Sequence, residues 1–124
     1  MILLLTTALT ASRSAAQWPK KPTKMTFPSG RTVVILSVDE IELRIPKERG
    51  LESALSLYYE TKVPRGDTVA LGKEINEVWT WLKRDADHRK LRYALVFAQP
   101  ADHHCAEGNA LFSKMPDGSW KKNP

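Results

Sequence analysis

One segment of this chain has the periodicity of an amphipathic helix, and strand-like segments lie on both sides of it. Asp67 stands just before the segment, where a carboxylate can accept hydrogen bonds from the free N–H groups of a first helical turn. Asp85 and Arg89 have the spacing of an intrahelical ion pair. We therefore expect a helix over about Thr68–Asp87. Its apolar residues form a single stripe: Leu71, Ile75, Val78, Trp79, Leu82 and Ala86.

The segments around this helix have the β-branched and alternating composition of strands. Both sides of the segment 93–98 are apolar, which is typical of a central strand, and Asp117-Gly118 predicts a tight turn into Trp120. Asp39-Glu40 is interpreted as a polar break. The order of strands, one helix and strands predicts an α+β fold: a mostly antiparallel sheet of about five strands with one amphipathic helix packed across it. The main strands are expected at 32–38, 41–45, 55–61, 93–98 and 110–115, after a short extended piece at 25–27.

The first residues have the layout of a secretory signal peptide. Residues 1–11 are apolar or hydroxylated and uncharged, and Ser14 and Ala16 are the small residues that a cleavage site requires. The apolar run is shorter than the roughly 20 residues of a membrane-spanning helix. We therefore divide the chain into a signal peptide (1–16), an extended basic leader (17–24) and a single α+β domain (25–124), and expect an exported protein, periplasmic or secreted, with no transmembrane span.

Size, charge and cysteine content narrow the function further. A chain of 124 residues is long enough for one domain, and its single cysteine excludes an intramolecular disulfide. The formal net charge is +5, and loss of Arg13 with the signal peptide lowers it to +4, which favours acidic partners. We assign Trp79 and Phe97 to the core rather than to a base-stacking platform, so we expect no nucleic-acid partner.

The segment Asp102–Glu107 contains the most conspicuous cluster of reactive side chains. Asp102–Cys105 spells the signature of protein palmitoyltransferases, but those enzymes are polytopic membrane proteins with a cysteine-rich zinc domain, which this chain lacks. Neighbouring side chains on an extended chain point in opposite directions, so the cluster is poorly arranged around one ion. We expect a solvated loop with no metal, no cofactor and no catalytic residue. The metal-ligand candidates, should a metal bind, are His103, His104, Cys105 and Glu107.

Part of the sequence also resembles a group of short, exported bacterial proteins that have no assigned activity. The resemblance covers roughly Ser53–Ala98 and the tail, and the Asp102–Cys105 run departs from it. It implies a bacterial source and export, and it implies no catalytic residue. The residues that carry it are Leu57–Thr61, Asp67, Ala70, Leu71, Glu74, Val78, Trp79, Asp85 and Asp117–Trp120.

These observations favour a non-catalytic binding or accessory protein of the cell envelope. Its partner would be another protein or an anionic envelope component. Two alternatives remain: a metal-binding protein that uses the Asp102–Glu107 loop, and a secreted inhibitor that acts by inserting a loop or adding a strand to its target.

Export predicts a defined mature N-terminus. We expect cleavage between Ala16 and Gln17, because the apolar run ends there at small residues. The intact mass of the protein recovered from periplasm or medium measures the cleavage site. A secreted protein that still begins at Met1 would contradict the assignment.

Overall fold

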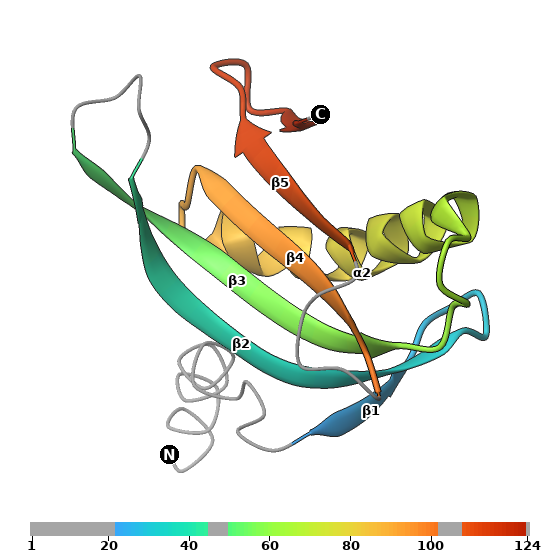
Figure 1. Ribbon diagram of the computed structural model, residues 1–124. Coiled ribbons are helices and arrows are strands. Elements are labelled where there is room, and N and C mark those ends of the chain that lie inside the picture. Colours follow the sequence, from blue (N-terminus) through green and yellow to red (C-terminus); the bar gives the residue numbers. More distant parts are fainter. Residues whose placement is uncertain (1–21, 45–49, 102–107, 124) are drawn as a thin grey trace, which may run out of the picture.

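The computed structural model describes residues 22–44, 50–101 and 108–123. Its strands form one six-stranded sheet in which spatial order follows chain order, and the helix lies across one face (Figure 1). The elements are β1 (Thr23–Thr26), β2 (Thr32–Arg44), β3 (Leu51–Thr61), α2 (Thr68–His88), β4 (Tyr93–Pro100), β5 (Gly108–Lys114) and β6 (Trp120–Lys122).

The α+β class is confirmed, but the sheet differs from the expected one in strand number and direction. It has six strands rather than about five, and it is mixed, because β3 and β4 are parallel while the other neighbours are antiparallel. The helix explains the parallel pair. A chain that leaves one strand and crosses the sheet as a helix returns to the end where that strand began, so the next strand runs in the same direction.

Strand β2 is longer than the sequence suggested. Asp39 and Glu40 continue the strand and pair with Ser56 and Leu55 of β3, so the predicted polar break is wrong. Carboxylates are tolerated there because both side chains are exposed. The real irregularity comes earlier, as a bulge between Ile35 and Ser37. The extra residue keeps Ile35 and Val38 together in the core.

The predicted helix is confirmed, and it ends one residue later than expected, at His88. Asp67 caps its first turn by accepting a hydrogen bond from the N–H of Ala70 at 3.1 Å. At the other end, Arg89 Nε lies 2.8 Å from Asp85 Oδ2, and Arg89 Nη1 lies 3.0 Å from Glu40 Oε1 of β2. Arg89 therefore connects the C-terminal end of the helix both to the preceding helical turn and to the sheet.

The core lies between the apolar stripe of α2 and the face of the sheet that the helix covers. Trp79 stacks on Phe112 of β5 with ring centroids 4.2 Å apart and meets Trp120 edge-on at 4.9 Å. The expected stripe is buried except for Leu71, which is partly exposed and packs against the core. From β3 and β4 the core receives Leu55, Leu57, Tyr59, Ala94, Val96 and Ala98.

Packing at Trp79 should dominate the stability of this fold. Trp79→Ala should lower the free energy of unfolding by about 3–5 kcal/mol, because it removes a buried aromatic side chain that two other rings contact. Lys83→Ala, an exposed position on the same helix, should change it by no more than about 0.5 kcal/mol. The urea denaturation midpoints of the two variants measure this difference. Equal effects would show that the apolar stripe of the helix does not face the core.

Candidate functional site

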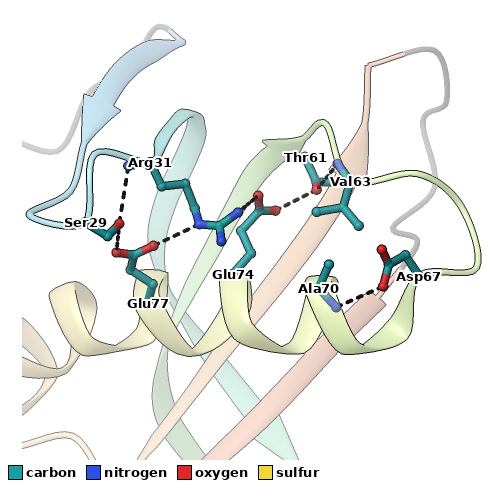
Figure 2. A network of polar contacts seen from close by, with 8 residues as sticks. All are labelled: Ser29, Arg31, Thr61, Val63, Asp67, Ala70, Glu74 and Glu77. Atoms are coloured by element: carbon teal, nitrogen blue, oxygen red, sulfur yellow. Dashed lines mark hydrogen bonds and ion pairs between the residues drawn. The ribbon is translucent and has the colours of Figure 1, made fainter.

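A buried carboxylate, Glu74, sits on the core side of α2 and belongs to a network of polar contacts that joins the helix to the sheet (Figure 2). Thr61 Oγ1 donates a hydrogen bond of 2.6 Å to Glu74 Oε1, and Arg31 Nη1 lies 3.2 Å from Glu74 Oε2. Burial, followed by the nearby Glu74 carboxylate, raises the pKa of the Tyr59 hydroxyl far above its ordinary value. The raised pKa favours the protonated form of the Tyr59 hydroxyl.

The same arginine connects Glu74 to the turn between β1 and β2. Arg31 Nε lies 2.9 Å from Glu77 Oε1, and Ser29 Oγ donates a hydrogen bond to the same carboxylate (Figure 2). The N–H of Arg31 donates to Ser29 Oγ at 3.2 Å. This polar network joins the β1–β2 turn, the end of β3 and the helix. Its central carboxylate has a side chain only 5% exposed, so the geometry supports a structural role rather than contact with a substrate.

A second polar cluster ties the end of α2 to the last hairpin. Asp87 Oδ1 accepts hydrogen bonds of 2.8 Å from both Lys114 Nζ and Trp120 Nε1. Partial burial raises the pKa of the Asp87 carboxyl, but these two hydrogen bonds outweigh it and leave the pKa below its ordinary value. The contact fixes Trp120 against Trp79. This cluster, like the network around Glu74, connects elements of the fold to one another.

The opposite face of the sheet is the best candidate for a functional surface. No described helix or strand packs on it, since α2 lies behind β3, β4 and β5 on the other face (Figure 1). At its centre Tyr58 of β3 stacks on Phe97 of β4, with ring centroids 4.4 Å apart and an interplanar angle of 12°. We call this surface the helix-free face. Its half-buried apolar side chains come from four neighbouring strands: Val34, Ile41, Leu43, Tyr58, Leu95, Phe97 and Leu111.

The alternation of strand residues explains how this face forms. On β3 and β4, Leu57 and Val96 pair and turn toward the helix, so the next pair, Tyr58 and Phe97, turns away. The assignment of Phe97 to the core was therefore wrong, because its side chain is half-buried on the face away from the helix. Because β4 is apolar on both sides, the helix-free face carries apolar side chains at its centre, where an ordinary two-layer fold would carry polar ones.

The structure leaves the predicted metal candidates untested. His103, His104, Cys105 and Glu107 all lie outside the described residues, as does Asp102. Within residues 22–44, 50–101 and 108–123, no group of three or more His, Cys, Asp or Glu side chains is placed to hold a metal ion. The same ranges contain no helix that is both long and apolar enough to cross a membrane.

The sequence analysis did not predict two of these features, the contacts of Glu74 and the Tyr58–Phe97 stack. A signal for Glu74 existed, because it lies on the apolar stripe next to Ile75, where an acid has to find a partner. The Tyr58–Phe97 stack gave no such signal. It depends on the parallel register of β3 and β4, which pairs these two residues.

Comparison with protein-family models, with curated proteins and with solved structures finds no match for this chain. A function must therefore be argued from the residues and surfaces described above.

The network around Glu74 can be tested by stability alone. Glu74→Ala should lower the free energy of unfolding by about 1–3 kcal/mol, because it leaves the buried Thr61 hydroxyl without its acceptor. Glu77→Ala should cost no more than about 1 kcal/mol, since that pair is more exposed. Urea denaturation at neutral pH compares them. If Glu77→Ala proved the more costly change, the buried carboxylate would not be the centre of the network.

Proposed function

We propose that this protein is a non-catalytic binding domain of the bacterial cell envelope, and that its helix-free face is the binding surface. The observation that carries the proposal is the Tyr58–Phe97 stack at the centre of an apolar surface on which no described element packs. Apolar side chains gathered on the surface of a soluble protein often mark an interaction site.

Composition and geometry support binding rather than catalysis. The polar clusters around Glu74 and Asp87 consist of ion pairs and hydrogen bonds between elements of the fold, and each is explained by the contact it makes. Aromatic side chains such as Tyr58 and Phe97 provide much of the binding energy in many protein interfaces, because they contribute large areas at a small cost in conformational entropy.

Charge and the expected export restrict the partner. The formal net charge of +5, or +4 once the expected signal peptide is removed, favours approach to acidic surfaces. Polar side chains border the aromatic pair: Ser37 pairs with Tyr58, and Asn109 pairs with Phe97. A partner protein or an anionic component of the envelope would suit such a surface.

Photo-crosslinking in the native host tests the binding surface directly. A photoreactive phenylalanine analogue at position 97 should form adducts with a partner in the envelope fraction, because this position lies at the centre of the helix-free face. The matched control carries the analogue at Lys73, an exposed position on the helix. Adducts are detected by a shift in mass on denaturing gels.

The outcomes test the binding surface and the cellular location of the protein independently. Adducts at position 97 but not at position 73 support the helix-free face. Equal adducts at both positions, or none at position 97, would refute it as the binding surface. Recovery of the protein from the cytoplasmic fraction with an intact N-terminus would refute the envelope assignment whatever the crosslinks show.

A further inference from the structure

Strand β2 has an outer edge that the described part of the chain leaves without a partner strand. β1 pairs with β2 only from Thr32 to Ile35, whereas β2 continues to Arg44. Its stretch from Leu36 to Arg44 is roughly 30 Å long at about 3.3 Å per residue. This stretch, which we call the open edge, pairs with β3 on its inner side. In Figure 1, β2 extends well past the short β1.

Two local features end the β1–β2 pairing at Ile35. Pro22 precedes the first residue of β1 and has no N–H to donate to a ladder. The bulge in β2 lies at the same level, between Ile35 and Ser37, and changes the course of the strand there. The open edge is therefore a consequence of the sequence, and its outward N–H and C=O groups are a template for another extended segment.

The side chains of the open edge alternate in chemistry. Ile41 and Leu43 lie half-buried on the helix-free face, while Glu42 and Arg44 are exposed on the face that carries the helix. A strand added beside β2 would have its own side chains alternate in the same way. Its residues on the helix-free face would extend the apolar surface there.

The charge of the open edge selects among possible occupants. Asp39 and Glu42 are exposed and make no ion pair with another described residue, and Glu40 is bound by Arg89. A cationic side chain opposite Asp39 or Glu42 would be stabilised, whereas like charges directly opposite each other are destabilising. A second copy of this chain, paired antiparallel across Asp39–Glu42, would set carboxylates against carboxylates.

We propose that the open edge of β2 binds an extended segment of a partner polypeptide in which apolar residues alternate with lysine or arginine. The segment adds a strand to the sheet: backbone hydrogen bonds supply affinity, and the alternating apolar and acidic positions of β2 supply specificity. The open edge shares Ile41 and Leu43 with the helix-free face, but it binds through the backbone of β2 rather than through the Tyr58–Phe97 stack. The proposal therefore does not depend on the proposed function.

A synthetic peptide provides the probe. We expect the end-capped peptide Lys-Val-Lys-Val-Lys-Val-Lys, fluorescein-labelled, to bind the purified protein in fluorescence-anisotropy titrations at low salt. The same peptide with alternate backbone amides N-methylated keeps its charge but cannot form the ladder, so it should bind at least about tenfold more weakly. Amide hydrogen exchange should show added protection within Leu36–Arg44 when the unmodified peptide binds.

Matched variants locate the site. Glu42→Lys should weaken peptide binding at least about tenfold, because it places a like charge opposite a peptide lysine. Glu60→Lys makes the same charge change on β3, an interior strand, and should leave binding within about twofold. Phe97→Ala should also leave binding within about twofold, which separates this proposal from the one for the helix-free face.

Several results would overturn the proposal. Equal binding of the N-methylated peptide would show charge attraction without strand addition. Equal weakening by Glu42→Lys and Glu60→Lys would place binding elsewhere. Failure of the unmodified peptide to bind would remove the cationic partner, and a dimer in sedimentation equilibrium that Glu42→Lys abolishes would make a second copy the occupant.

Discussion

The packing of one helix against one face of the sheet is the constraint on which the rest of this structure depends. A helix the length of α2 spans roughly 30 Å at 1.5 Å per residue, which is enough to cross several strands. A single helix can cover only one of the two faces of the sheet. Its stripe buries Val78, Trp79 and Leu82 against β3, β4 and β5. The crossover that places it there also makes β3 and β4 parallel. The helix thus determines the position of the core, the parallel direction of β3 and β4, and which face of the sheet has no described helix on it.

The features that the sequence predicted correctly are those fixed by local spacing. The stripe on α2, its Asp67 cap and the Asp85–Arg89 pair depend on residues within one or two turns of each other. The turn at Asp117-Gly118 is equally local, since Gly118 takes the positive φ of 90° that glycine adopts most easily. Each can therefore be identified before the fold is known.

The features that sequence reasoning missed depend on contacts between distant segments. Phe97 lies in a strand whose two sides are both apolar, so alternation alone could not decide which side met the helix. The parallel direction of β4 required knowing that α2 is a crossover between neighbouring strands. The Arg31–Glu74 pair joins residues that are 43 positions apart, and a local sequence pattern cannot predict a pair at that separation. The metal candidates at His103–Cys105 and Glu107 lie outside the described residues, and that prediction stays open.

The two faces of the sheet differ in how strongly packing constrains their residues, and this difference affects how such a domain could acquire a binding role. Substitution at Trp79 or Leu82 affects the core directly, so these positions have little freedom. Tyr58 and Phe97 contact each other on the far side of the sheet, away from the helix. Substitution of Tyr58 or Phe97 removes the contact between the two rings but none of the side chains that pack against the helix. The exposed Asp39 and Glu42 make no ion pair with another described residue. The described core lies between the helix and one face of the sheet, and the surfaces that we propose for recognition lie on the other face and at the open edge.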